Sequence, residues 1–470
     1  MVEIAPQPTA AQQEFSDRVV VRFEGPGCGQ GPLSWGQWEI WDTMRKTASS
    51  LPIGGVVAVR PGRTVQDIAE ELRFFLSRYE SMRTKVRFDA NGDPYQVLAD
   101  RGEAVLGIVD VDDAGDPLQA GLRLEERWRA VQFDHEREWP IRMAAVRHRG
   151  VPTHVVVIVS HFATDGVGVG IMVRDLRAWQ AGGSAGSRAA AMGPLELARH
   201  QREPSAMRQS EMSLRYWDRL LRKADPVRFA PGQDRSQPRY MRTDLDSPAL
   251  YLALKRLTPG GAGADMPVLL AAYARATARV TGISPSLVRM TVNNRFRAGL
   301  AEVSHPLCLN GLLMLDVAQV SFAEAVERAR AASLHGMKYA YYNPTDLYRL
   351  RAAVAADRGC EVDLGMLFND QRSADRLEEA GPPPTPEEIS AALSGHSLRR
   401  EPMALFIEKL MVFARDVPGE FVRLSAESDR RYVSAREVEQ ILLSMEAIVV
   451  QAACNSAVLA DAPRPESAVS

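Results

Sequence analysis

Histidine and cysteine are scarce in this chain of 470 residues, which has eight histidines and four cysteines. Cys28, Cys308, Cys360 and Cys454 lie far apart and form no CxxC pair. This usage predicts neither a zinc site nor a disulfide framework, because both need cysteines at defined spacings. We therefore expect no bound metal, and a reducing cytoplasm fits the chain best.

An excess of charge of one sign is also lacking, since 57 lysines and arginines face 59 aspartates and glutamates for a net charge of −2. A nucleic-acid partner or an anionic membrane surface would require a basic excess. The N-terminal stretch MVEIAPQPTAAQQEF lacks the basic start and apolar core of a signal peptide, and no apolar run is long enough to span a membrane. We expect a cytoplasmic protein with neither nucleic acid nor membrane as a partner.

Sequence signatures of common cofactor sites are absent as well. The chain has neither a GxxxxGK[ST] phosphate-binding loop nor an HExxH metal motif. The GVGVG segment at 166–170 follows a predicted strand, but it has no acidic ribose partner at the distance that a dinucleotide site requires. A triad of Ser160, His161 and Asp165 is disfavoured because adjacent residues of a strand point to opposite faces. We expect no cofactor bound by the chain itself.

Two domains are expected, because 470 residues exceed what one hydrophobic core normally supports. Strands alternate with helices and form hairpins, which favours an α/β class with mixed sheets. We predict an N-terminal lobe over 15–180, a C-terminal lobe over 209–460, and a linker of small residues over 181–208 between them. Residues 1–14 and 461–470 are predicted to be flexible tails.

The hydrophobic pattern predicts the elements of both lobes. In the N-terminal lobe we expect a helix capped by Ser34, a helix beginning at Thr64, and a hairpin turned at Asn91-Gly92. A further helix is expected over 117–131, with strands over 19–23, 106–111, 141–146 and 155–160. In the C-terminal lobe we expect helices over 209–221, 266–281, 322–334, 345–355 and 434–453, an irregular segment over 224–249, and strands over 251–257, 287–292, 309–317, 362–368, 403–413 and 419–425.

The stretch VVVIVSHFATDGVGVGIMVRDL over 155–176 combines the features of a site. Its β-branched run predicts a buried strand, and the apolar spacing from Val167 onward predicts a helix. Between them, His161 leaves the end of a rigid strand, and Asp165 and Gly166 follow in the turn. The same pattern fits a hydrogen-bonded core histidine with an aspartate that caps the helix, so the residues alone leave both interpretations open.

The segment HFATDG over 161–166 resembles the HxxxDG core of condensation domains from nonribosomal peptide synthetases, in the superfamily that contains chloramphenicol acetyltransferase. Four further stretches are similar to condensation-domain motifs and come in the expected order. They are Leu33-Ser34 with Gln37 and Trp41 (LSxxQxxxW), Arg78–Thr84 (RHExLRT), Tyr216-Trp217 with Leu220-Leu221 (YWxxxL), and Arg295 followed by Leu309-Asn310-Gly311. The resemblance therefore covers nearly the whole chain.

Two departures from the family pattern stand out. Ser160 occupies the place of the first of two histidines, and strand alternation predicts that residue 160 points away from the cleft that His161 faces. The DFGWG sequence of plant-type acyltransferases in this superfamily is absent, which argues against that branch. No carrier-protein or adenylation domain is appended, so we expect a free-standing condensation enzyme.

The resemblance implies an α/β fold of two chloramphenicol acetyltransferase-like sandwich lobes in one chain, with the active-site tunnel between them. It implies that His161 is catalytic and accepts the proton of the nucleophile or orients it, for which a neutral imidazole is suited. Asp165 then supports the site by pairing with an arginine, for which Arg295 is the candidate. Gly166 is expected to let the backbone pass tightly and to offer its N–H to an oxyanion, and His305 is expected to be structural.

Three functional hypotheses follow. The first is natural-product condensation, in which an acyl or aminoacyl group passes from the phosphopantetheine arm of a carrier protein to an amine or alcohol, free or carrier-bound, to form an amide or ester. The second is an O- or N-acyltransferase that uses an acyl-CoA donor. The third is a non-catalytic recruitment module that keeps the fold. Two lobes in one chain complete the implied site without a second subunit, so we expect a monomer.

Overall fold

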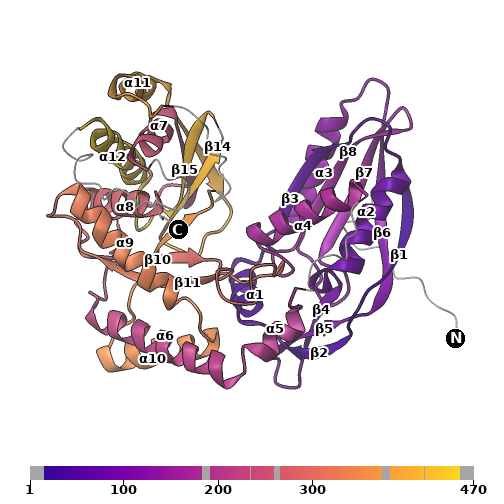
Figure 1. The fold of residues 1–470 in the computed structure, drawn as a ribbon, viewed down its shortest axis with the longest axis horizontal. Helices are drawn as coiled ribbons and strands as arrows, with labels where there is room; N and C mark the ends of the chain where they lie inside the picture. The colour runs from indigo at the N-terminus through magenta and orange to yellow at the C-terminus, as the bar shows by residue number, and fades with distance from the viewer. Residues whose placement is uncertain are drawn as a thin grey trace, which may run out of the picture. The chain divides into compact units, whose positions relative to one another are not determined.

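The computed structural model describes residues 15–182, 191–232, 234–258, 265–372, 382–417 and 419–455. The chain divides into two compact units, each described here by itself (Figure 1). The first comprises Met1–Met207 and Asn293–Leu309, and the second comprises Arg208–Val292 and Asn310–Ser470. The expected tails at 1–14 and 461–470 lie outside the described residues. Residues 293–309, which we expected in the C-terminal lobe, belong instead to the first unit, so Arg295 lies in the same unit as His161.

A five-stranded sheet forms the centre of the first unit, in the order β1 (Asp17–Glu24), β6 (Arg101–Val111), β7 (Ile141–His148), β8 (Val151–Val159) and β3 (Ile53–Ala58). Helices α2 (Val65–Arg78) and α4 (Gly166–Gln180) pack on one face, with Leu72 and Met172 in the core there. Helix α3 (Pro117–Ala130) packs on the other face through Leu124 and Trp128. Because the sheet is buried on both faces, residues 155–159 of β8 read as a continuous apolar run in the sequence.

A smaller three-stranded sheet, ordered β2 (Gly29–Pro32), β5 (Pro94–Leu98) and β4 (Thr84–Phe88), completes the first unit together with α1 (Trp35–Thr47) and the 3-10 turn η2 (Glu80–Arg83). The hairpin at Asn91-Gly92 is confirmed, and so are the helix starts at Ser34 and Thr64, both of which form capping boxes. Strands β2 and β3 were not predicted. Their glycines weaken the strand pattern, and pairing with β5 and β8 overrides that local preference.

The predicted linker over 181–208 contains regular structure. Residues 183–190 lie outside the described part of the chain, but helix α5 (Pro194–His200) follows, and α6 (Pro204–Lys223) begins inside the expected linker. Both helices start with a proline, whose fixed φ suits the first helical turn. The expectation of a structureless linker is therefore wrong from residue 194 onward.

A seven-stranded sheet forms the second unit, in the order β11 (Leu309–Leu315), β10 (Ser286–Val292), β12 (Met366–Asp370), β14 (Leu410–Val417), β15 (Phe421–Asp429), β9 (Tyr240–Ser247) and β13 (Ser397–Met403). Helices α7 (Pro248–Leu257), α8 (Met266–Thr281) and α12 (Ala435–Cys454) contribute most of the helical side chains in its core. The remaining elements are α9 (Phe322–Lys338), α10 (Pro344–Arg358), α11 (Pro386–Ala392) and the 3-10 turn η3 (Leu393–Gly395).

Three predictions for the second unit are wrong. Residues 251–257 form the end of helix α7 rather than a strand, and Ser247 caps this helix at its N-terminus. The buried residues Ala249, Leu250, Ala253 and Leu254 recur at helical spacing, which a short apolar window does not separate from a strand. Part of the expected irregular segment 224–249 forms strand β9, and residues 404–409 interrupt the strand expected over 403–413.

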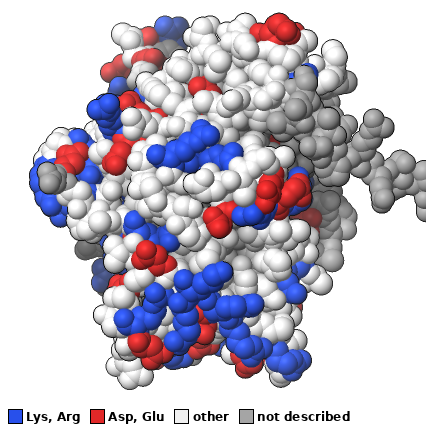
Figure 2. Space-filling model, turned by 90° about the vertical axis from the view of Figure 1, so that its left-hand side faces the viewer, with Lys and Arg blue, Asp and Glu red and all other residues white. Residues whose placement is uncertain are grey.

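Charges of both signs are mixed on the face shown in Figure 2, with basic side chains gathered in its lower part at the level of α6 and α10. Arg208, Arg215, Arg219 and Arg222 of α6 are exposed. Arg222 pairs with Asp218 at 2.7 Å and with Asp357 of α10 at 2.9 Å, so acidic neighbours offset part of this charge. No helix within the described ranges is both long and apolar enough to cross a membrane.

Candidate active site

His161 lies in the turn that joins the buried end of β8 to helix α4. Along β8, Val155 and Val159 face the core beneath α2 and α4, whereas Val156 and Ile158 face α3. Side chains of a strand alternate between its faces, so the next residue, Ser160, continues the α3 side. The end of β8 next to the turn is buried, which makes it a rigid base for a side chain that follows it.

The ring of His161 is suited to accept a proton. Its backbone N–H donates to the carbonyl of Ser50 at 3.2 Å, which fixes the main chain at this point. The side chain is partly exposed, while its Nδ1 atom is buried and has no hydrogen-bond partner among the described residues. Burial lowers the pKa of His161, and the nearby negative charge of Asp165 only partly opposes this effect. The imidazole is therefore neutral at neutral pH.

Asp165 and Arg295 form a buried, bidentate ion pair. Arg295 Nη2 donates to Asp165 Oδ1 at 2.8 Å, and Arg295 Nη1 donates to Asp165 Oδ2 at 3.0 Å. The side chains are 2% and 6% exposed, so little water competes for either charge. Arg295 also donates to the carbonyls of Val303 at 2.8 Å and His305 at 3.2 Å. The pair thus ties the turn after His161 to the segment 293–309 that returns from the second half of the sequence.

The carboxylate of Asp165 has no free hydrogen-bonding capacity for catalysis. Besides Arg295, it accepts from the N–H groups of Gly168 at 2.9 Å and Leu307 at 3.1 Å, and from Cys308 Sγ at 3.4 Å. Burial raises the pKa of Asp165, but the charge and hydrogen bonds of Arg295 outweigh it, and the net pKa is lowered. Asp165 is therefore an ionised helix cap that holds several backbone segments together.

Gly168, rather than Gly166, is the glycine whose backbone meets another segment closely. A Cβ atom on Gly168 would lie 2.0 Å from the carbonyl oxygen of Ser304 and 2.5 Å from Thr164 Oγ1. A Cβ on Gly166 would meet nothing within 4 Å, and Gly166 does not have a positive φ. The expectation that Gly166 lets the backbone pass tightly is wrong, because the close approach comes at the first inward-facing position of α4.

Replacing Gly168 with alanine is expected to destabilise the protein by about 1–3 kcal/mol, since the added methyl group must displace backbone. The matched control is Gly166→Ala, which adds the same group in open space and favours the helix, so its stability should stay within about 1 kcal/mol of wild type. Urea unfolding of both variants measures the difference. Equal midpoints for the two variants would contradict the close packing of α4 on residue 304.

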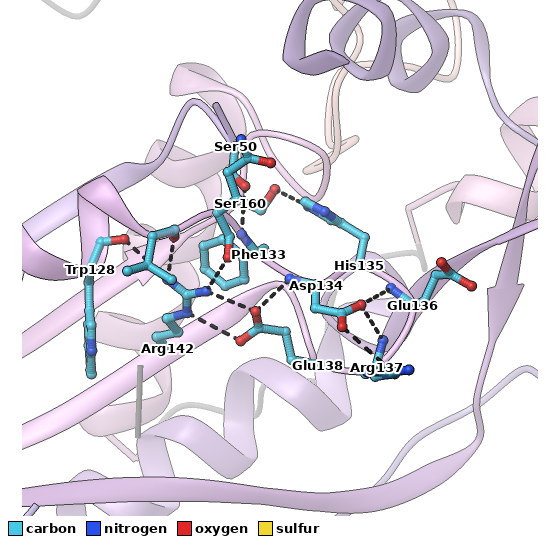
Figure 3. A network of polar contacts seen from close by, with 12 residues as sticks. Ser50, Trp128, Phe133, Asp134, His135, Glu136, Arg137, Glu138, Arg142 and Ser160 are labelled. Atoms are coloured by element: carbon cyan, nitrogen blue, oxygen red, sulfur yellow. Dashed lines mark hydrogen bonds and ion pairs between the residues drawn. The ribbon is translucent and has the colours of Figure 1, made fainter. Parts of the chain in front are cut away.

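Ser160 is fully buried and forms a hydrogen bond with a histidine that sequence analysis did not select. Ser160 Oγ lies 2.7 Å from His135 Nε2 (Figure 3). The N–H of Phe162 donates to the same hydroxyl at 3.3 Å. His135 lies in the loop between α3 and β7, within the sequence Phe133-Asp134-His135-Glu136. No local motif marks this position, so only the spatial neighbourhood identifies it.

His305 is separated from this chemistry. It is 2% exposed, and its Nε2 atom lies 3.2 Å from the carbonyl oxygen of Met192. Burial lowers the pKa of His305 to about 4, which keeps the ring neutral. Within the described ranges, no group of three or more histidine, cysteine, aspartate or glutamate side chains is arranged to hold a metal ion.

Two further motif stretches stabilise the elements around the turn. Arg78 donates to Asp175 of α4 from Nε at 3.1 Å and from Nη2 at 2.8 Å, and the hydroxyl of Tyr79 donates to the same carboxylate at 3.0 Å. Ser34 and Gln37 form the capping box of α1, and the Gln37 side chain also donates to Gln96 at 3.1 Å. These motif residues therefore hold helices in place, and their contacts are structural rather than chemical.

Comparisons with known proteins identify the family to which the chain is similar. The Condensation domain family model matches residues 46–382. Cyclosporin synthetase from Tolypocladium inflatum is 24% identical over 284 residues, which is 58% of this chain but only 2% of the synthetase. The chain therefore spans only a small fraction of the length of this relative.

Solved structures show the same fold at low identity. The first condensation domain of the CDA synthetase is 18% identical with a TM-score of 0.64, covering 91% of this chain and 97% of that domain. The epimerization domain from the third module of tyrocidine synthetase B is 12% identical with a TM-score of 0.68, covering 92% of this chain and 98% of that domain. The predicted α/β fold with two lobes in one chain is confirmed, and it is the fold of these condensation and epimerization domains. With most of its length matched by one family model, the chain belongs to the condensation-domain family.

Proposed function

We propose that this protein transfers an acyl or aminoacyl group from a carrier-protein thioester to an amine or alcohol, and so forms an amide or ester in natural-product biosynthesis. Membership of the condensation-domain family supports a condensation role of this general kind. The observation that carries the proposal is the geometry of the turn after β8. A neutral His161 is presented from a rigid strand end, while Asp165 and Arg295 are fully engaged in holding that turn.

In the proposed reaction, the nitrogen or oxygen of the acceptor attacks the carbonyl carbon of the thioester. His161 accepts the proton of the attacking N–H or O–H group, or orients that group, because its imidazole is neutral. The new C–N or C–O bond forms, the C–S bond breaks, and the sulfur leaves as the free thiol of the phosphopantetheine arm, with the proton that the acceptor gave up. The N–H of Gly166 remains the predicted donor to the oxyanion, since it opens helix α4 at the positive end of the helix dipole.

The phosphopantetheine arm of the carrier enters this scheme as part of the substrate. This chain matches only 2% of cyclosporin synthetase, so the activity and substrates of that whole protein do not carry over to it. We propose that a carrier protein delivers the donor, and that the acceptor is a small amine or alcohol, free or carrier-bound. Two further properties stay predictions: that the enzyme acts without a covalently attached carrier protein, and that it is a monomer.

Incubating the purified 470-residue chain with a panel of acyl-carrier thioesters and candidate amines and alcohols tests the proposal. We expect mass spectrometry to detect an amide or ester that forms with the carrier-bound donor and not with folded His161→Ala protein. Each donor is also offered as the acyl-CoA, which presents the same acyl-phosphopantetheine thioester on an adenine nucleotide in place of the carrier protein. Equal rates with acyl-CoA would favour the second hypothesis, an acyl-CoA-dependent acyltransferase.

The recruitment hypothesis gives a different outcome in the same experiment. A non-catalytic module predicts no product with any donor, and it predicts that His161→Ala leaves the output of the pathway unchanged. Loss of pathway output in that variant, with protein levels maintained, would exclude it.

A further inference from the structure

The imidazole of His135 lies directly beside the position at which this chain departs from the family motif. Ser160 is fully buried, and its hydroxyl contacts His135 Nε2 at 2.7 Å. The His135 ring packs edge-on against Phe162 and Trp41, with centroid distances of 5.7 Å and 5.9 Å. Since the ring is itself 8% exposed, a histidine side chain at position 160 would need space that His135 already fills.

A second connection joins the same loop to the neighbouring residue of the turn. The hydroxyl of Ser50 accepts from the N–H of Phe133 at 2.8 Å, and the carbonyl of Ser50 accepts from the N–H of His161 at 3.2 Å. Phe133 is therefore linked through Ser50 to His161, and His135 contacts Ser160 directly. The loop is thus joined to two consecutive residues of the turn. These hydrogen bonds connect the loop to the backbone that carries the His161 ring.

The loop itself is held rigidly by Arg142 of β7 (Figure 3). The guanidinium donates to the carbonyls of Trp128 at 3.1 Å, Val131 at 2.8 Å and Gln132 at 2.9 Å. It also forms an ion pair with Glu138 at 2.8 Å. The Arg142 guanidinium lies over the ring of Phe133 at 3.9 Å from its centroid. A buried cation with this many partners fixes the loop before any substrate binds.

Burial lowers the pKa of His135 to about 4, so the ring stays neutral across the physiological range. A neutral ring and a serine hydroxyl form one hydrogen bond, in which one partner donates and the other accepts. The hydroxyl still accepts from the N–H of Phe162 at 3.3 Å, so the two contacts form a short chain. The link between the loop and the turn is therefore independent of pH near neutrality.

We propose that His135 is a positioning residue for His161, and that the Ser160–His135 pair takes the structural place of the first motif histidine. The inference concerns how the imidazole of His161 is aimed, so its catalytic consequence rests on the proposed function. Its structural consequence, an altered environment of the His161 ring, does not depend on the reaction.

The central variant is His135→Phe, which keeps an aromatic ring against Phe162 and Trp41 but removes the nitrogen that contacts Ser160. We expect the protein to fold, kcat to fall on the order of 10-fold or more, and KM to change little, because small displacements of a catalytic group are costly. Ser160→His alone should be destabilised by overpacking against His135. The exchange His135→Ser with Ser160→His in one chain should regain the stability lost by Ser160→His and restore kcat toward wild type.

Nitrogen NMR of the His161 ring, measured through a pH titration with His161→Ala for assignment, provides a readout that needs no turnover. We expect the ring signals and the apparent pKa of His161 to shift in His135→Phe and to return in the exchanged variant. If the signals do not move and kcat equals that of wild type, the positioning role is wrong. If wild type transfers no acyl group but the His161 signals do shift, the proposed function fails while the positioning role of His135 stands.

Discussion

His161→Ala protein is expected to keep its fold and to lose acyl transfer by about 10²–10⁴-fold in kcat, the usual contribution of a positioned general base. The fold should survive because the hydrogen bond from residue 161 to Ser50 is made by the backbone. The substitution also removes a buried Nδ1 atom that has no partner among the described residues, so no hydrogen bond is broken there. Single-turnover kinetics with a carrier-bound donor, together with a thermal unfolding curve, measure both halves of the expectation.

The matched control for this experiment is His305→Gln. Burial lowers the pKa of His305, as it does for His161, but the His305 ring contacts the carbonyl of Met192 instead of lying in the turn after β8. We expect His305→Gln to lower the melting temperature while kcat stays near that of wild type. Full turnover by folded His161→Ala protein would show that this ring is not the base, whatever the stability of the control.

The local sequence around His161 was sufficient to predict the strand, the turn and the helix. A β-branched run, a polar turn and helical apolar spacing come in direct succession there, and β8 and α4 follow that order. The capping of α4 by Asp165 was one of two interpretations that the residues left open, and Asp165 does accept from Gly168. The ion pair with Arg295, which the resemblance implied, is formed by the same carboxylate.

Other parts of the site depend on contacts between distant segments, which local patterns do not encode. Residues 293–309 return to the first unit across the chain, and only this return brings Ser304 against Gly168. His135 has no motif of its own, because its importance comes from the hydroxyl of Ser160. Tyr251–Leu257 was assigned to a strand because a short apolar window has no clear period, although α7 is a helix.

The fold alone does not decide which reaction this protein carries out. Its structural neighbours include both a condensation domain and an epimerization domain with similar TM-scores of 0.64 and 0.68. Function resides in the site that a fold carries, so the roles of individual residues need their own tests. The scaffold role of Asp165 is one role that needs such a test, and loss of its carboxylate is expected to lower the stability of the protein strongly.

Asp165→Ala is expected to destabilise the protein by about 3–5 kcal/mol, because it leaves the Arg295 guanidinium buried without its counter-charge. Arg295→Ala should cost a similar amount, since the Asp165 carboxylate then loses its bidentate partner. In the double variant neither charge is left alone, so its loss of stability should be smaller than the sum of the two single losses. Urea unfolding of the three variants measures this coupling, and additive losses would contradict a direct pair. If Asp165→Ala is inactive yet melts like wild type, the scaffold role is wrong and Asp165 acts in catalysis.

The pH dependence of this stabilisation has a definite sign. The folded pKa of Asp165 is lowered by Arg295, whereas in the unfolded chain the carboxyl titrates near its usual value of about 3.9. The unfolded state therefore binds the proton more tightly than the folded state. The stabilisation is complete at pH values above the unfolded pKa, and it is lost as the pH falls through the folded pKa.

Asp165→Asn is the matched variant, because it has nearly the same shape and cannot ionise. We expect the difference in unfolding free energy between wild type and Asp165→Asn to be constant from pH 5 to pH 8 and to shrink below about pH 4. A difference that instead grows on acidification would mean that Asp165 is protonated in the folded protein, and that Arg295 does not stabilise its charge.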